Sequence, residues 1–258
     1  MKIVILTAVL VLLSEAGLTN TGMSVPQWYT PCSNKERHSQ SHRLRAVSNK
    51  NVIGRKLIKS LTKMTQQLNK TMELFKNQLL DDSYEEIQRA VDELQYVPKW
   101  VPGMGNVLML FGERSIHLEV SRYLPKLHVE LQKFSVAFEA VTNTERQRDI
   151  VEDTNTLLIQ FLCEVEQALV MHQIGVPAPR EERSLMADDE RIPPDVTRHL
   201  IRDWGILVKY RDYLRYWRKL LTKMEKQRRK ELKVWKEVKN QIPNTHARKV
   251  RPSSAEFQ

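Results

Sequence analysis

The sequence predicts an all-α protein, an up-up-down-down four-helix bundle with two long crossover loops, and three observations lead to this fold class. Four long segments carry apolar residues at intervals of three and four, which places those residues on one face of an α-helix. No segment alternates apolar and polar residues over a length that would build a sheet. The connections between the helical segments are long, short and long in chain order, which is the loop pattern of that bundle.

The chain begins with the features of a secretory signal peptide. Lys2 precedes an apolar run of 11 residues, and Ser14 and Ala16 are the small residues that signal peptidase selects. The run is shorter than the ~20 residues that a membrane span needs. We therefore expect a signal peptide over 1–16, a basic N-terminal segment over 17–50 and a secreted protein without stable membrane insertion.

The first helix has the clearest pattern in the chain. Its apolar stripe runs for about 28 residues, with no proline. The one N-glycosylation sequon, Asn69-Lys70-Thr71, lies within it and predicts a glycan on Asn69 beside the stripe. The stripe consists of Ile53, Leu57, Leu61, Met64, Leu68, Met72, Phe75 and Leu79.

The next two helices are predicted to be close neighbours. The second covers 113–141, with Pro125 as a kink. The third begins at a capping box formed by Thr142 and Glu145 and stops near Gly175. Only a few residues join the two, so they must be antiparallel.

The fourth helix starts after Pro194 and continues past Trp235, and it contains the stretch DWGILVKYRDYLRYWRKLL. Its aromatic and aliphatic residues again recur at intervals of three and four, which predicts a stripe that faces the core. The cations between the stripe positions then lie on its flanks and its solvated face. The stripe consists of Leu200, Leu207, Tyr210, Leu214, Trp217, Leu221 and Met224.

The lengths of the connections favour the crossover topology. About 30 residues join the first and second helices, and they hold a short helix capped by Ser83 with Glu86 and the turn-rich stretch VPKWVPGMG. About 20 proline-rich residues join the third and fourth. Each can run the length of a bundle over 51–224, beyond which a basic extension covers 225–258. The alternative is an up-down-up-down bundle with long surface loops.

Two cysteines, Cys32 and Cys163, follow the signal peptide. In an oxidising compartment the simplest arrangement is one disulfide, which stabilises by ~4–5 kcal/mol in the chain-entropy model. The alternative is two free thiols.

Charge is distributed unevenly along the chain. The net charge is +10, with 18 basic and 7 acidic residues over 195–258, 9 basic and 1 acidic over 35–63, and an excess of acidic residues over 64–194. For a secreted chain this predicts extracellular polyanions such as heparan sulphate as partners, and no nucleic acid.

No catalytic or metal-binding constellation is present in the sequence. It has no G-x-S-x-G, no H-E-x-x-H and no glycine loop that would hold a phosphate. His117 and His128 share one helical pattern but stand about 16 Å apart at 1.5 Å per residue, too far to share a metal ion. We expect no enzyme, no cofactor and no metal.

Several features together give a resemblance to a known family. A signal peptide, four long helices with crossover loops, and a last helix that carries Trp204-Gly205, Val208, Tyr210, Tyr213 and Trp217 resemble the long-chain helical cytokines of the leukaemia inhibitory factor and ciliary neurotrophic factor class. The nearest resemblance is to the insect unpaired family of JAK/STAT ligands. It covers the mature chain in architecture and about 25 residues in motif.

That resemblance implies a receptor contact at the start of the last helix. In the family a Phe-x-x-Lys pair stands there, with Lys three residues and Phe six residues before the glycine. Here those places hold Arg202 and His199, so the cation is kept and the phenylalanine is missing. His199, Leu200 and Arg202 are the predicted receptor-binding residues, with Leu200 as the apolar contact.

The sequence therefore supports two functions of different classes. One is a secreted cytokine-like ligand of a cell-surface receptor that activates JAK/STAT-type signalling. The other is a secreted amphipathic-helical protein that binds lipid or membrane surfaces. In either case the basic run after Met224 is predicted to be the polyanion site, because unpaired cations do not pack in a core. Its best cations are Arg228, Arg229, Lys230 and Lys233.

Overall fold

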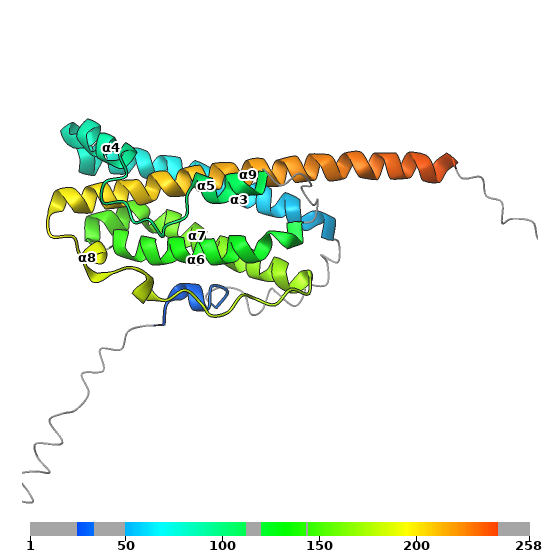
Figure 1. Ribbon diagram of the computed structural model, residues 1–258, viewed down its shortest axis with the longest axis horizontal. Coiled ribbons are helices and arrows are strands. Elements are labelled where there is room, and N and C mark those ends of the chain that lie inside the picture. Colours follow the sequence, from blue (N-terminus) through cyan, green and yellow to red (C-terminus); the bar gives the residue numbers. More distant parts are fainter. Residues whose placement is uncertain (1–24, 34–49, 112–119, 143, 242–258) are drawn as a thin grey trace, which may run out of the picture.

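The computed structural model describes residues 25–33, 50–111, 120–142 and 144–241, and this part of the chain is helical without a β-strand (Figure 1). The prediction of an all-α protein is confirmed. The expected signal peptide over 1–16, most of the N-terminal basic segment and the end of the tail lie outside the described residues. Among the described helices, none combines the length and apolar character needed to cross a bilayer.

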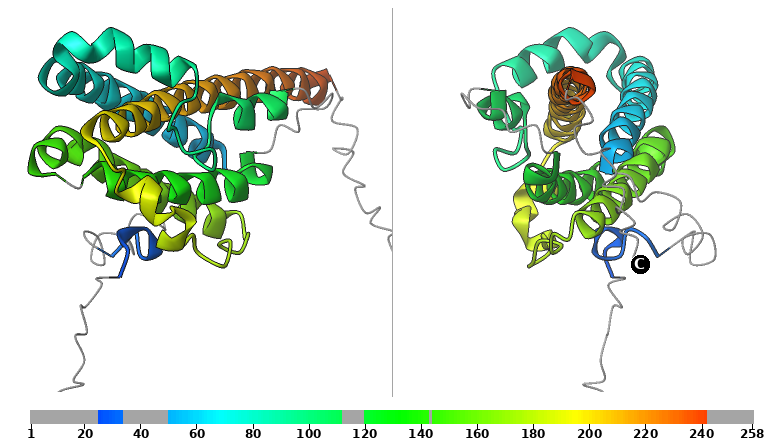
Figure 2. Two further views of the ribbon diagram at one scale, coloured as in Figure 1. Left: turned by 60° about the vertical axis from the view of Figure 1, so that its left-hand side comes forward. Right: turned by 90° about the vertical axis from the view of Figure 1, so that its right-hand side faces the viewer.

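Four long helices enclose one interior, as the end-on view in Figure 2 shows, and a cluster of buried apolar side chains fills it. These helices are α3 (Lys50–Phe75), α6 (Leu124–Val141), α7 (Glu145–Met171) and α9 (Val196–Gln241). Two shorter helices, α4 (Tyr84–Asp92) and α5 (Met104–Phe111), pack on α9. The remaining elements are single turns: η1 (Gln27–Tyr29), η2 (Lys76–Leu80), η3 (Asp81–Ser83), η4 (Val120–Arg122), η5 (Arg183–Leu185) and α8 (Asp188–Arg191).

The predicted apolar stripes form the core. In α3 every stripe residue from Ile53 to Phe75 is buried. In α9 the stripe from Leu207 to Met224 is buried as well, and the ring of Tyr210 lies 4.7 Å from that of Phe134 in α6. The aromatic residues of the last helix therefore serve mainly to hold the bundle together.

Helices α3 and α7 are antiparallel neighbours. Toward the start of α3, the Ser60 hydroxyl donates to the Glu164 carboxylate at 2.7 Å. Toward its end, the hydroxyls of Thr71 and Thr154 lie 2.8 Å apart. Rising residue numbers in one helix thus meet falling numbers in the other.

Helix α9 runs antiparallel to both α3 and α6. The Glu225 carboxylate lies 3.8 Å from Arg55 near the start of α3, while the rings of Trp204 and Phe75 lie 6.1 Å apart near its end. Against α6, the Tyr213 hydroxyl donates to Glu130 at 2.8 Å.

Gly205 permits a close approach between α9 and the connection that follows α4. A Cβ atom at position 205 would lie 2.4 Å from Cγ2 of Val97, closer than real Cβ contacts come. The turn-rich stretch after Val97 leads into α5, a helix that the sequence analysis does not predict. The apolar run over 104–111 is short and has glycine and proline close to it, so it does not give a clear helical pattern in the sequence.

The second predicted helix starts later than expected. α6 begins at Leu124, after the 3-10 turn η4, and residues 112–119 lie outside the described part. Pro125 lies in the first turn of α6, where the missing N–H breaks no intrahelical bond. The prediction that Pro125 kinks a longer helix is therefore wrong.

The predicted capping box before the third helix is also misplaced. Thr142 ends α6, and Thr144 caps α7 by accepting a hydrogen bond from the backbone N–H of Gln147 at 3.2 Å. Because the two helices are joined by so few residues, the first threonine is needed to end one helix and the second to begin the next. α7 ends at Met171, four residues before Gly175.

A disulfide joins Cys32 to Cys163, as the count of two cysteines predicts, with 5.1 Å between the Cα atoms. It fastens the segment around η1 to α7. Trp28 of that segment is buried, and its indole N–H donates to the carbonyl of Glu181 at 2.7 Å. The short N-terminal segment thus also holds the connection between α7 and α9.

Candidate interaction surfaces along helix α9

Arg202 lies inside the bundle, with 1% of its area exposed. Its Nε donates to Oδ1 of Asp203 at 2.7 Å, and its Nη1 donates to the carbonyl oxygens of Glu190 at 2.8 Å and Arg191 at 2.6 Å. Its Nη2 donates to the carbonyl of Ala140 at 3.2 Å. The expectation that Arg202 offers a surface cation to a receptor is therefore corrected: these partners hold the guanidinium between α6, α8 and α9.

Asp203 completes this buried polar cluster. Its Oδ2 accepts a hydrogen bond from Nε2 of Gln147 in α7 at 2.8 Å. Burial raises the pKa of Asp203 to about 6, although the neighbouring Arg202 and Gln147 act in the opposite direction. The cluster ties together helices that meet at one end of the bundle, so its role is structural.

His199 and Leu200, the other two predicted receptor residues, are half-buried in the first turns of α9. Burial, together with the charge of Arg202, lowers the pKa of His199, so the imidazole is neutral at physiological pH. Both side chains remain partly accessible at this end of the bundle, and their contact with a receptor stays a prediction.

Exposed apolar side chains gather at the start of α9. Val196 is 74% exposed in its first turn, and Ile192 is exposed just before it. From the connection after α4, the half-exposed ring of Tyr96 lies 4.7 Å from the guanidinium of Arg198. Arg198 is also paired with Asp195 at 3.1 Å. Sequence reasoning missed this combination because Tyr96 lies about a hundred residues away in the chain.

The other end of α9 extends beyond the other helices (Figure 1). From Lys226 to Trp235 its side chains are exposed, except that Arg228 is half-buried. Trp235 is 60% exposed. Most of the charged side chains in this stretch of α9 are therefore accessible at the surface.

Two of the four predicted polyanion-binding cations share one carboxylate. Glu225 accepts from Nη2 of Arg228 at 2.8 Å and from Nε of Arg229 at 3.1 Å. Lys230 and Lys233 are exposed further along α9. The quartet is brought to one stretch of helix, but its two arginines are already engaged with an anion.

The sequon lies with its asparagine outside and its threonine inside. Asn69 is exposed on α3, whereas Thr71 is buried and its hydroxyl contacts both Thr154 and the carbonyl of Ile150. A glycan on Asn69 would project into solvent from the folded protein. The threonine hydroxyl that the sequon requires is accessible only before α3 docks on α7.

A second buried polar cluster secures the connection after α7. Nε2 of His128 lies 3.0 Å from Glu166 and 2.8 Å from Nη1 of Arg180. Burial alone would raise the pKa of Glu166, but its bonds to His128 and Arg180 outweigh burial, and the pKa is lowered. Within the described residues, no group of three or more His, Cys, Asp or Glu side chains is arranged to hold a metal ion.

Comparison with protein-family models, with curated proteins and with solved structures finds no match to this chain.

Proposed function

We propose that the protein is a secreted, up-up-down-down four-helix ligand that binds a cell-surface cytokine-type receptor and activates JAK/STAT-type signalling. The observation that carries this proposal is the set of antiparallel helix pairs. α3 and α6 each pack against α7 and α9, and the contacts of each pair run in opposite chain directions.

Such pairing is expected when the first two long helices share one direction and the last two share the other. An up-down-up-down bundle would instead place α3 and α6 side by side as antiparallel neighbours, and these two are absent from the main packing pairs of the described residues. The two long connections, over 76–123 and 172–195, are long enough to return the chain along the bundle.

The start of α9 is the surface that best suits a receptor contact. Exposed apolar groups with a neighbouring guanidinium are typical of the residues that dominate protein interfaces. Tyr96, Ile192, Val196 and Arg198 supply them here, beside His199 and Leu200. Arg198 takes the surface role that the family resemblance assigns to position 202.

The lipid-binding alternative has less support. A bundle that opened to spread on lipid would have to separate the Arg202–Asp203 cluster from α6 and α7 and break the Thr71–Thr154 contact, leaving buried polar groups unpaired. The disulfide from Cys32 to Cys163 further restricts such opening. A closed bundle that binds through its outer surface fits these contacts better.

Affinity for extracellular polyanions completes the proposed function. The basic second half of α9 would retain a diffusible ligand in the matrix close to its source, since arginine and lysine bind sulphate groups well. This retention is separate in space from the proposed receptor contact, because the two surfaces lie at opposite ends of α9.

A pair of matched substitutions tests the receptor surface. Val196→Asp places a charge in the first turn of α9, where an acidic residue suits the helix dipole and should not weaken folding. Val170→Asp is the control, because Val170 is similarly exposed, at 64%, but lies near the end of α7 at the opposite end of the bundle. Thermal unfolding of both variants is compared first, since an aspartate near a helix C-terminus opposes the helix dipole.

In a JAK/STAT reporter assay on responsive cells, we expect Val196→Asp to reduce potency by about tenfold or more, the effect of losing a central apolar contact. Val170→Asp should stay within about twofold of the unchanged protein by the same reasoning. Equal potency of the two variants would remove the receptor contact from this surface. No response to the unchanged protein would refute the proposed function itself.

A further inference from the structure

Four stretches of the sequence place an arginine three residues after another arginine or lysine, the spacing that basic-residue-specific endoproteases of the secretory pathway recognise. Such an enzyme binds each cation in an acidic subsite and hydrolyses the peptide bond after the second one. The last stretch lies outside the described residues, and the surroundings of the other three in the fold differ. The four stretches are residues 180–183, 215–218, 226–229 and 248–251.

The stretch over 180–183 is fixed to the bundle through its side chains and its backbone. Nε of Arg183 donates to both carboxylate oxygens of Glu139, at 2.8 and 2.9 Å. The backbone N–H of Glu181 donates to an amide oxygen of α6 at 3.0 Å, and its carbonyl accepts from Trp28 at 2.7 Å. A protease needs these same backbone groups, because it binds its substrate as an extended strand. The peptide bond after Arg183 is therefore protected.

The stretch over 215–218 is protected by the core. Trp217 has no exposed area, and its ring lies 6.1 Å from that of Tyr213. Drawing this part of α9 into the cleft of a protease would bring buried aromatic surface into water, which opposes its opening.

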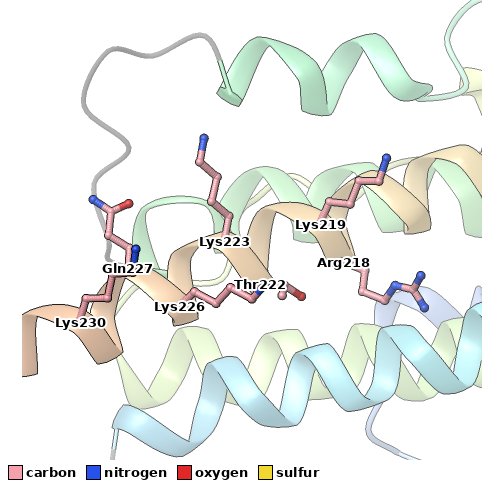
Figure 3. Close-up of a pocket in the computed structure, with 7 residues that line it drawn as sticks. All are labelled: Arg218, Lys219, Thr222, Lys223, Lys226, Gln227 and Lys230. Atoms are coloured by element: carbon pink, nitrogen blue, oxygen red, sulfur yellow. The ribbon is translucent and has the colours of Figure 1, made fainter. Parts of the chain in front are cut away.

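The stretch over 226–229 lies where α9 passes beyond the other helices (Figure 1). Glu225 is the last buried residue of α9 among the side chains that the structure describes. The four side chains that follow it are exposed, except that Arg228 is half-buried. Figure 3 shows Lys226 and Gln227 extending from the helix at this place. A protease can therefore reach this stretch without displacing a core residue.

Cleavage requires the end of α9 to open, because the peptide bond after Arg229 lies within a helix. None of the side chains from 226 to 235 is buried, so opening brings little additional apolar surface into water and has a low free-energy cost. The Glu225 carboxylate accepts from Arg228 at 2.8 Å and from Arg229 at 3.1 Å. Pairs at these spacings stabilise a helix only slightly, so they oppose the opening weakly.

We propose that a proprotein convertase, a serine endoprotease of the secretory pathway that is specific for basic residues, cuts α9 after Arg229. This inference rests on the secretion proposed above, since such an enzyme meets only proteins that pass through the secretory pathway. Water adds across the bond between Arg229 and Lys230: the C–N bond breaks, a carboxylate forms on Arg229, and the amine released on Lys230 takes up the proton.

The cut separates the two surfaces that the proposed function places at the ends of α9. The chain from Lys230 onward holds seven basic and three acidic residues, and its removal takes Lys230 and Lys233 away from Arg228 and Arg229. The start of α9 stays on the larger product. Processing therefore lowers retention by extracellular polyanions and preserves the receptor contact, which converts a matrix-bound ligand into a diffusible one.

Two variants with the same chemical change test the site. Arg229→Lys keeps the charge but replaces the guanidinium that the protease subsite binds. Arg215→Lys makes the same change at another exposed residue of α9, outside 226–229. The purified full-length proteins, with the disulfide intact, are incubated with a purified proprotein convertase, and the products are identified by mass spectrometry.

We expect the unchanged protein to give a product that ends at Arg229 and a fragment that begins at Lys230. Arg229→Lys should slow this cleavage by about tenfold or more, because a subsite built for a guanidinium holds an ammonium poorly, and Arg215→Lys should stay within about twofold. The larger product should unfold thermally at the same temperature as the full chain and elute from heparin at a lower salt concentration. Medium from insect or mammalian cells that secrete the protein should contain the same product, and a convertase inhibitor should restore the full chain.

A full chain that resists the enzyme would overturn the proposal, and a synthetic peptide covering 222–236 that is cut in parallel would show that α9 protects the bond. Cleavage after Arg183 or Arg218 instead would overturn it as well. Cells that secrete only the full chain would overturn processing and leave the receptor function in place, whereas absence of the protein from the medium would refute the proposed secretion and processing together. Equal elution from heparin before and after cleavage would overturn the release from the matrix.

Discussion

Replacing Arg202 by methionine should destabilise the protein severely. The guanidinium donates to Asp203 and to three backbone carbonyls, and its side chain is excluded from solvent. In the Arg202→Met variant, Asp203 would keep Gln147 as a donor but would lose its buried cation. Removing one partner of a buried ion pair typically costs about 3–5 kcal/mol.

The matched variant is Arg202→Met combined with Asp203→Leu, which removes both charges at once. Replacing a buried pair by apolar residues of similar volume is often close to neutral. We therefore expect the double variant to be less destabilised than the sum of the two single variants, with an interaction free energy of about 1–3 kcal/mol.

Urea unfolding with the disulfide intact measures both effects. A lower midpoint with an unchanged m-value would report a loss of stability. If Arg202→Met changed the free energy of unfolding by less than about 0.5 kcal/mol, as a surface substitution does, Arg202 would not be buried and its role as a receptor cation would have to be considered again.

Three further predictions concern other sites. Gly205→Ala should destabilise the folded protein by about 1–3 kcal/mol, because the new Cβ atom would lie 2.4 Å from Cγ2 of Val97. Gly54→Ala is the control: its Cβ atom would have its nearest contact at 3.6 Å, so thermal unfolding should show a neutral effect or a gain of up to about 1 kcal/mol. Burial raises the pKa of Asp203 from 3.8 to about 6 in the folded protein. As the pH rises from about 4 to 6, the unfolded chain therefore releases this proton before the folded protein does, and the folded protein should lose stability on the order of 1–3 kcal/mol. Asp203→Asn should abolish that part of the pH dependence in urea titrations, and an unchanged slope would contradict the assignment. Protein secreted from insect or mammalian cells should lose mass on glycosidase treatment, and Asn69→Gln should eliminate the shift; a mass that the glycosidase leaves unchanged would show that the sequon is unused.

The sequence predicts the helical core well because periodicity reports directly which side chains are buried. The positions from Ile53 to Phe75 and from Leu207 to Met224 are buried as their spacing requires. The spacing cannot locate helix ends with the same accuracy, since those depend on local hydrogen bonds. Thr142 and Thr144 both have the chemistry of a helix cap, and only the three-dimensional path of the chain decides that Thr144 caps α7.

The candidate functional sites are harder to predict, because the residues that surround a side chain in the fold are often far from it in the sequence. Arg202 stands where the cytokine class that the sequence resembles has a receptor-binding lysine, but carbonyl groups of α6 and α8 accept hydrogen bonds from it inside the bundle. The charge-rich run after Met224 correctly marks α9 as basic. It does not reveal that Glu225 engages Arg228 and Arg229.

The most direct test of the proposed receptor function is STAT tyrosine phosphorylation in responsive cells within minutes of adding purified, disulfide-intact protein. We predict a dose-dependent rise that saturates, that Val196→Asp weakens and that Val170→Asp leaves in place. Absence of phosphorylation at every dose, together with absence of saturable binding to the cell surface, would contradict the assignment of this helical protein as a receptor ligand.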